Sequence, residues 1–133
     1  MALWERCGLT RPWNDPHDDI ALARTSGASA VLVGRQGGSV VASAMVGTDG
    51  HRGWVYYLAV DPDLRRQGLG RRIMGACEVW AEGRGVPKIQ LMVRGSNTAT
   101  VGFYEALGYV QEDTVILGKR FDGQSWSAAP RQD

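Results

Sequence analysis

The apolar residues of this chain recur at two different spacings, and the spacings predict both helices and strands. Helical spacing, in which apolar positions follow one another at intervals of three or four, is clearest at Leu69, Ile73, Cys77 and Trp80. Short apolar runs rich in β-branched residues and separated by glycine turns are typical of strands and hairpins. The predicted helices cover residues 2–7, 15–27, 69–84 and 97–107. The predicted strands cover residues 30–35, 39–46, 54–60, 88–94 and 109–121.

This order of elements predicts an α+β fold built on a mixed α/β sheet. Three antiparallel strands are expected first, and the strand over 88–94 should run parallel to the strand over 54–60, because a connection through a helix crosses over in a right-handed sense. We predict one domain over residues 1–121. The remaining residues, 122–133, are polar and small and are expected to form a flexible tail.

Composition narrows the class of protein without naming its chemistry. A chain of 133 residues with 44% hydrophobic residues can bury one core without disulfides or a metal. The net charge of +1 gives no general attraction to nucleic acid or to anionic lipid, and no apolar run approaches the length of a membrane span. Cys7 and Cys77 lie far apart and form no metal-binding pattern, so we expect a reduced, cytoplasmic protein without a bound metal.

A glycine turn after an apolar strand is the strongest chemical signal in the sequence. Gly68 and Gly70 open the predicted helix over 69–84, so a ligand can approach the main chain, and the free N–H groups of the first helical turn favour an anion. Four arginines surround this turn: Arg65, Arg66, Arg71 and Arg72. The pattern suits a pyrophosphate, although any strand-to-helix turn can use glycine. The spacing matches neither the Walker phosphate loop nor the dinucleotide-binding fingerprint.

Two further motifs give the chain a family resemblance. They read Val-Arg-Gly-Ser-Asn at residues 93–97 and Phe-Tyr-Glu-Ala-Leu-Gly-Tyr at residues 103–109. Together with the glycine turn they resemble the GNAT superfamily of N-acetyltransferases, over roughly residues 30–121. Residues 3–7, 11–16 and 49–53 resemble, more narrowly, the YpeA-type bacterial acetyltransferases. The family fold starts with a strand that this sequence lacks, and an exposed sheet edge would favour a homodimer or instability.

The resemblance implies acetyl-CoA as the co-substrate and assigns roles to particular residues. Tyr104 would protonate the departing thiolate, and Asn97 would contact the cofactor arm. Backbone groups of one strand would hold the pantetheine, and the turn would bind the pyrophosphate. These cofactor-binding residues are Leu58, Ala59, Val60, Arg65, Arg66, Gln67, Gly68, Leu69, Gly70 and Arg71. From the pattern alone, Asn97 is equally a helix cap, and Tyr104 belongs to a core stripe with Val101 and Leu107.

The residue that removes a proton from the acceptor is left open. A lysine-like amine with a pKa of about 10.4 is neutral only about once in a few thousand molecules at pH 7. The strand over 54–60 carries no carboxylate, and Met92 stands where ribosomal-protein acetylating members have a glutamate. The candidates are Asp15, Asp18, Asp19, His51 or a chain of waters. Trp13 and Tyr56 are candidates for lining an acceptor pocket, although large aromatic residues are more often core.

The sequence therefore predicts an acetyl-CoA-dependent N-acetyltransferase. It would move the acetyl group to a primary amine, on a small molecule or a protein amino terminus, by direct transfer in a ternary complex. The alternative is a module that binds or senses CoA or an acyl-CoA without turnover. A third possibility, acetylation of aminoacyl-tRNA, is disfavoured by the balanced charge, so nucleic acid and membrane are not expected partners.

Overall fold

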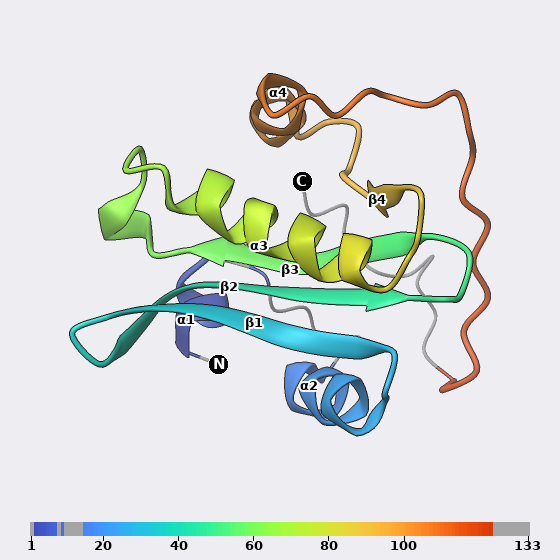
Figure 1. The fold of residues 1–133 in the computed structure, drawn as a ribbon, viewed down its shortest axis with the longest axis horizontal. Coiled ribbons are helices and arrows are strands. Elements are labelled where there is room, and N and C mark those ends of the chain that lie inside the picture. The colour runs from blue at the N-terminus through green and yellow to red at the C-terminus, as the bar shows by residue number, and fades with distance from the viewer. Residues whose placement is uncertain (1, 8, 10–14, 124–133) are drawn as a thin grey trace. The chain divides into compact units, whose positions relative to one another are not determined.

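A computed structural model gives the fold of residues 2–7, 9 and 15–123 (Figure 1). The chain divides into two compact units, Met1–Met92 and Val93–Asp133, and each is described by itself. The predicted loop over residues 11–14, with Trp13, and most of the predicted tail over 122–133 lie outside the described residues. The first unit contains the sheet and the glycine turn, so most of the predicted cofactor-binding residues belong to it.

The first unit is built on a four-stranded mixed sheet with the strand order β1-β2-β3-β4. The strands are β1 (Ser29–Gln36), β2 (Ser39–Thr48), β3 (Gly53–Val60) and β4 (Ile89–Leu91). The first three form an antiparallel meander, and β4 pairs parallel to β3. Gly37 and Gly38 form the β1–β2 turn with φ angles of 58° and 86°, which residues with a Cβ rarely adopt. The predicted mixed sheet and its meander are confirmed.

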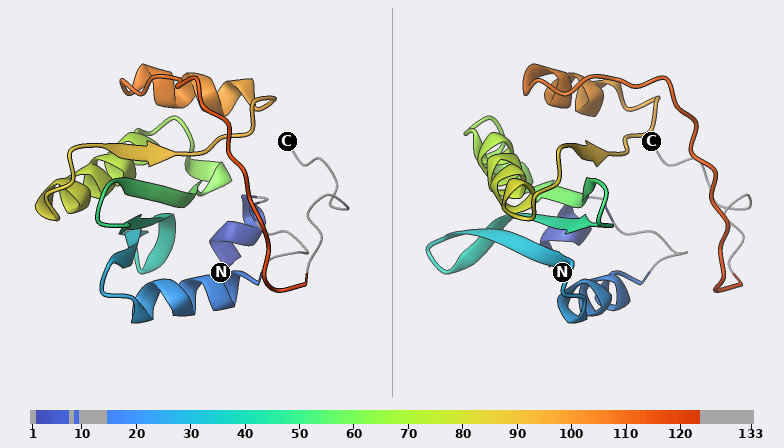
Figure 2. Two further views of the ribbon diagram at one scale, coloured as in Figure 1. Left: turned by 90° about the vertical axis from the view of Figure 1, so that its right-hand side faces the viewer. Right: turned by 45° about the vertical axis from the view of Figure 1, so that its right-hand side comes forward.

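Helices lie on both faces of this sheet, as the left view in Figure 2 shows. They are α1 (Ala2–Arg6), α2 (Pro16–Thr25) and α3 (Leu69–Gly83), with a short 3₁₀ turn, η1 (Pro62–Leu64), before α3. The start of α2 agrees with its sequence signal, because the Asp15 carboxylate accepts a hydrogen bond from the His17 N–H at 2.9 Å. The predicted helices over 2–7, 15–27 and 69–84 are confirmed to within a few residues.

The two faces of the sheet have different cores. On one face α3 packs on β2 and buries an apolar stripe that consists of Ile73, Met74, Cys77 and Ala81. On the other face Leu3 and Trp4 of α1 pack with Ala59 of β3. The Trp4 Nε1–H donates to the Ser43 hydroxyl at 2.9 Å, and the pair is buried. This hydrogen bond joins α1 to β2 and satisfies two polar groups that burial would otherwise leave without a partner.

Two predicted strands differ from the structure. The strand over 88–94 is reduced to the three residues of β4, because the parallel ladder runs only from Gly53 to Val55 on β3.

In the second unit, α4 (Thr98–Ala106) confirms the helix predicted over 97–107. The prediction of a final strand over 109–121 is wrong for the described residues. Apolar side chains such as Val115 and Leu117 are 84% and 91% exposed there, and a strand requires a paired neighbour for its backbone groups.

Candidate functional site

The predicted phosphate turn forms a concave backbone at the start of α3. Gly68 is the N-cap residue and has a left-handed φ of 78°, and no side chain caps the helix. The first intrahelical hydrogen bond runs from the Arg72 N–H to the Gly68 carbonyl at 3.1 Å, so the amides of residues 69–71 precede the helical ladder. The first turn of α3 contains no acidic residue. These amides and the helix dipole together favour an anion.

A second left-handed residue, which the sequence did not indicate, shapes the same turn. Arg66 has a φ of 69°, and non-glycine residues adopt this region only occasionally. Backbone in alternating conformations of this kind directs successive N–H groups to one side and forms an anion-binding concavity. Arg65, Arg66, Arg71 and Arg72 are all exposed around it. The turn therefore combines backbone donors with exposed positive charge, and the residues present fit a pyrophosphate.

The strand that precedes this turn has an open edge. Beyond Val55, β3 has no strand partner on its β4 side among the described residues. The Asp61 N–H donates to the Val41 carbonyl of β2 at 2.8 Å, and in a trans peptide C=O and N–H point in opposite directions. The Val60 carbonyl therefore points away from β2. It accepts a hydrogen bond from the Cys7 thiol at 3.1 Å.

A β-bulge separates the paired and the open parts of β3. Ser43 pairs with Ala59 and Met45 pairs with Tyr56, so three steps along β3 correspond to two steps along β2. The extra residue lies at Tyr57, whose φ of 55° is left-handed. Its ring stacks on Trp4, with 4.1 Å between the ring centroids. The bulge therefore breaks the alternation of the strand and places consecutive tyrosines, Tyr56 and Tyr57, beside the same cavity.

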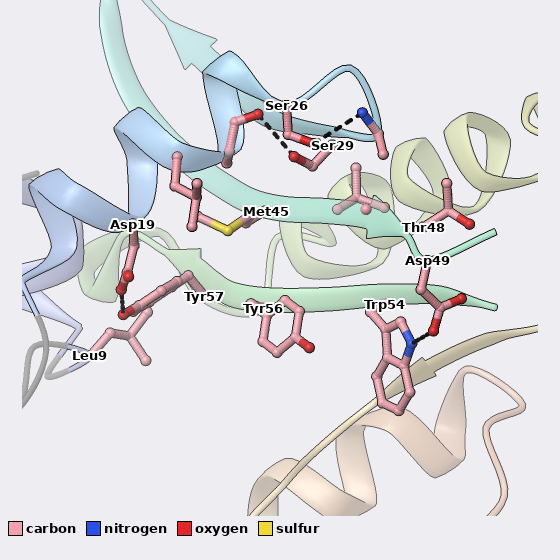
Figure 3. Close-up of a pocket in the computed structure, with 15 residues that line it drawn as sticks. Leu9, Asp19, Ser26, Ser29, Met45, Thr48, Asp49, Trp54, Tyr56 and Tyr57 are labelled. Atoms are coloured by element: carbon pink, nitrogen blue, oxygen red, sulfur yellow. Dashed lines mark hydrogen bonds between the residues drawn. The ribbon is translucent and has the colours of Figure 1, made fainter. Parts of the chain in front are cut away.

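That cavity lies between α2 and the sheet face opposite α3 (Figure 3). It has a volume of about 780 Å³, and its walls come from α2, the start of β1, β2, β3 and Leu9. The Tyr57 hydroxyl donates to Oδ2 of Asp19 at 2.5 Å across the cavity wall, and the Trp54 Nε1–H donates to Oδ2 of Asp49 at 3.2 Å. The apolar and aromatic lining residues include Leu9, Leu22, Met45, Trp54 and Tyr56.

The structure distinguishes the candidate proton acceptors. Asp15 caps α2, and Asp18 is exposed. His51 is exposed in the β2–β3 turn, where its backbone N–H donates to Asp49. Asp19 is half-buried and borders the cavity. Of the carboxylates named by the sequence, Asp19 is thus the one that the structure brings together with the predicted pocket residue Tyr56.

Three ionisable groups are shifted by their surroundings. Hydrogen bonds from the Arg52 and His51 amides lower the pKa of Asp49 to about 2. Burial raises the pKa of the Cys77 thiol to about 11, and the charge of Glu78 adds to the effect. Burial and the charge of Asp49 raise the pKa of Tyr56. The carboxylate of Asp49 at the cavity is therefore ionised at neutral pH, whereas Cys77 is a neutral core residue.

The second unit contains the two remaining predicted site residues. Asn97 is the N-cap of α4, and its side-chain oxygen accepts from the Thr100 N–H at 3.3 Å, so the capping interpretation is confirmed. Tyr104 is only 7% exposed, and its ring lies edge-to-face against Phe103 and Tyr109, with centroids 5.0 Å and 5.7 Å away. Its packing agrees with the core stripe. The proton-donor role of Tyr104 and the cofactor-arm role of Asn97 stay predictions.

The described residues contain neither a metal-binding cluster nor a membrane-spanning helix. No group of three or more histidine, cysteine or acidic side chains in this part of the chain is placed to hold a metal ion. None of its helices combines the length and the apolar character that a membrane crossing requires.

Similarity to known proteins agrees with this architecture. The model of the acetyltransferase (GNAT) family matches residues 1–109. An acetyltransferase of Yersinia enterocolitica is 46% identical over 120 residues, which cover 90% of this chain and 85% of the relative. One of Pectobacterium atrosepticum is 47% identical with the same shares of each chain. Among solved structures, the aminoglycoside N-acetyltransferase AAC(6')-Iy in complex with CoA has a TM-score of 0.77 at 16% identity, over 90% of this chain and 85% of that chain.

These matches define the class of protein as an acetyltransferase. The family match spans well over half of the sequence, and the relatives are far above the level of chance similarity. The chain belongs to the GNAT family. This confirms the family predicted from the motifs, and with it the assignment as an acetyl-CoA-dependent N-acetyltransferase.

Proposed function

We propose that this enzyme transfers the acetyl group directly to a primary amine, on a small molecule or a protein amino terminus, within a ternary complex. Bound acetyl-CoA supplies the activated acetyl group. The observation that carries the proposal is the backbone around Gly68, whose left-handed φ and uncapped helix start leave amide donors for a diphosphate. The residues proposed to hold it are Arg65, Arg66, Gln67, Gly68, Leu69, Gly70 and Arg71.

Backbone groups at the open edge of β3 are proposed to hold the pantetheine arm. They belong to Leu58, Ala59 and Val60, which follow the bulge directly. The absence of a neighbouring strand along this edge in the described residues leaves room for an extended ligand to pair with it. The Val60 carbonyl, which accepts a hydrogen bond from the Cys7 thiol, would accept one from the arm in addition to the thiol or in its place.

Direct transfer is favoured over a cysteine-bound intermediate by the state of both cysteines. Cys77 is fully buried, and its raised pKa keeps it a neutral thiol. Cys7 is half-buried, and its thiol donates a hydrogen bond to the Val60 carbonyl. Both are free thiols, which supports a reducing, cytoplasmic setting. The homodimer expected from the exposed sheet edge stays a prediction.

Tyr104 is proposed to give its phenolic proton to the departing sulfur, and Asn97 to contact the cofactor arm. A phenol within hydrogen-bond reach can supply this proton. The test is Tyr104→Phe, measured as kcat for acetyl-CoA consumption with a panel of amines and as the Kd of CoA. We expect kcat to fall by about 10²-fold, in the range of general-acid contributions, with CoA affinity within twofold of the wild type.

The matched control for this test is Tyr109→Phe, which removes a hydroxyl from the same ring cluster. Equal losses in the two variants would indicate a packing effect and remove Tyr104 from the chemistry. If the wild type binds CoA but acetylates no amine in the panel, a CoA-binding module without turnover explains the site better than an enzyme.

A further inference from the structure

The cavity beside α2 is unusual in combining apolar walls with a fixed carboxylate at one end. Leu22, Met45, Trp54 and Tyr56 form much of its lining, and Asp19 lies at the end near the bulge (Figure 3). Its volume of about 780 Å³ is within the range of roughly 300–1,000 Å³ that is typical of small-molecule sites. None of the expected cofactor-binding residues borders it. The cavity is therefore available for the second substrate.

Asp19 is the carboxylate best placed to meet a ligand there. Its Oδ2 accepts from the Tyr57 hydroxyl, so the side chain is held in one orientation. Asp49 also borders the cavity. Its Oδ1 accepts from the His51 and Arg52 amides and its Oδ2 accepts from Trp54, so its hydrogen bonds stabilise the β2–β3 turn. A charged group held at an apolar wall binds an opposite charge more strongly than one in open water does.

The position of Asp19 also fits the proposed route of transfer. Its partner Tyr57 is the bulge residue and directly precedes Leu58, where the pantetheine arm is proposed to lie. Asp19 is therefore hydrogen-bonded to a side chain of β3, the strand on which the pantetheine arm is proposed to lie. Asp18, one residue earlier on α2, is exposed and does not border the cavity.

We propose that this cavity binds the acceptor, and that the acceptor is a primary amine on an apolar or aromatic body, which binds as its ammonium and gives one proton to water before its nitrogen attacks the acetyl carbonyl. Asp19 is the specificity-determining residue that receives the ammonium, and Tyr57 is a positioning residue that orients Asp19. The apolar body lies along Trp54, Tyr56 and Leu22, where aromatic faces also favour a cation. This inference rests on the proposed function. An aminoglycoside is a poor fit, because its many hydroxyl groups would lose hydrogen bonds to water against these walls.

The test uses 2-phenylethylamine, an ammonium on an aromatic body, and aniline, which is neutral at pH 7. In Asp19→Asn we expect KM for phenylethylamine to rise at least tenfold, with KM for aniline and Kd for CoA within twofold. Tyr57→Phe should give a smaller rise in KM with kcat retained. Asp18→Asn removes the same charge one residue away and should change neither constant. Equal effects of Asp19→Asn on both amines, or no effect on either, would overturn the proposal.

A second pair of variants keeps the Asp19–Tyr57 hydrogen bond intact. A folding defect caused by the loss of that bond therefore cannot affect the result. Leu22→Arg places a cation at the cavity rim, whereas Val79→Arg does so on α3, and both residues are 72% exposed. We expect Leu22→Arg to raise KM for phenylethylamine at least fivefold and Val79→Arg to leave it unchanged. The proposal is wrong if these two variants behave alike, or if the wild type prefers kanamycin to phenylethylamine.

Calorimetry separates this proposal from the proposed function. Phenylethylamine is titrated into the CoA-loaded wild type and into CoA-loaded Asp19→Asn. At least tenfold weaker binding to the variant supports the cavity assignment even if no amine is acetylated. The assignment is wrong if the wild type binds CoA but takes up no phenylethylamine, or if the variant binds it equally well.

Discussion

The role of the glycine turn can be tested with two alanine substitutions at opposite ends of α3. Gly68 precedes the helix with a φ of 78°, and Gly85 follows it with a φ of 79°. A Cβ added at either position meets no heavy atom within 4 Å. The two substitutions therefore impose the same backbone strain without a clash, and they differ in whether they lie at the proposed phosphate site.

The expected stability cost is the same for both variants. A left-handed conformation costs a residue with a Cβ about 1–2 kcal/mol. In a domain of this size, 1 kcal/mol corresponds to about 4 °C in Tm, so each variant should melt about 4–8 °C below the wild type. Gly68→Ala should also weaken CoA binding about tenfold or more, equivalent to about 1.4 kcal/mol, because the new methyl group stands where the diphosphate approaches the amides.

The measurements are a thermal melt and a calorimetric titration with CoA for the wild type, Gly68→Ala and Gly85→Ala. Equal losses in Tm with a selective loss of CoA affinity in Gly68→Ala would confirm the turn as the anion site. If Gly68→Ala binds CoA as well as Gly85→Ala does, the diphosphate does not contact this turn. Unchanged melting of both variants would instead refute the strain argument.

Three further predictions concern the core of the first unit. Gly53→Ala should cost about 1–3 kcal/mol in urea unfolding, because its Cβ would lie 3.2 Å from the Ala81 Cβ in a close-packed contact. Trp4→Phe should cost about 1–3 kcal/mol by the same assay, because the buried Ser43 hydroxyl loses its hydrogen-bond donor. The Cys77 thiol, with its pKa raised from 9.0 to about 11, should make the free energy of unfolding fall as the pH rises from 9 to 11, and Cys77→Ala should abolish that part of the slope.

The controls and the sign of the pH effect follow from the structure. Gly34→Ala is the partner control for Gly53→Ala, because its Cβ would lie 3.5 Å from the Ala42 Cβ, an ordinary contact. Equal losses at the two glycines would contradict the packing argument. For Cys77, both states hold the proton below pH 9, and above it the unfolded chain loses the proton first. The contribution of Cys77 to the free energy of unfolding is therefore fully present below pH 9 and decreases above it. Parallel slopes of the free energy of unfolding against pH for the wild type and Cys77→Ala would contradict this reasoning.

The parts of the fold that were predictable have local signals. Asp15 and Pro16 mark the start of α2, Gly37 and Gly38 mark the β1–β2 hairpin, and Asn97 marks the start of α4. Each signal acts over a few residues, because caps and turns satisfy their own neighbouring backbone groups. The family motifs then added the cofactor, which no local pattern could have named.

What the sequence could not show depends on contacts between distant residues. Tyr57 gives no sign of a left-handed bulge, because tyrosine is an ordinary strand residue and the strain is held by Trp4 and Asp19. The sequence does not distinguish the three carboxylates at the start of α2. In the structure Asp19 borders the cavity and accepts a hydrogen bond from Tyr57, which lies 38 residues away in the sequence.

The extra residue at Tyr57 also bears on the solubility of the protein. A flat sheet edge with regularly spaced donors and acceptors is a template on which a strand of another molecule can add, and so a start for aggregation. A bulge increases the local twist and interrupts that spacing. β3 can therefore leave main-chain groups open to a small ligand while offering a poor surface to a foreign strand. Deleting Tyr57 should restore a flat edge and make the protein precipitate more readily.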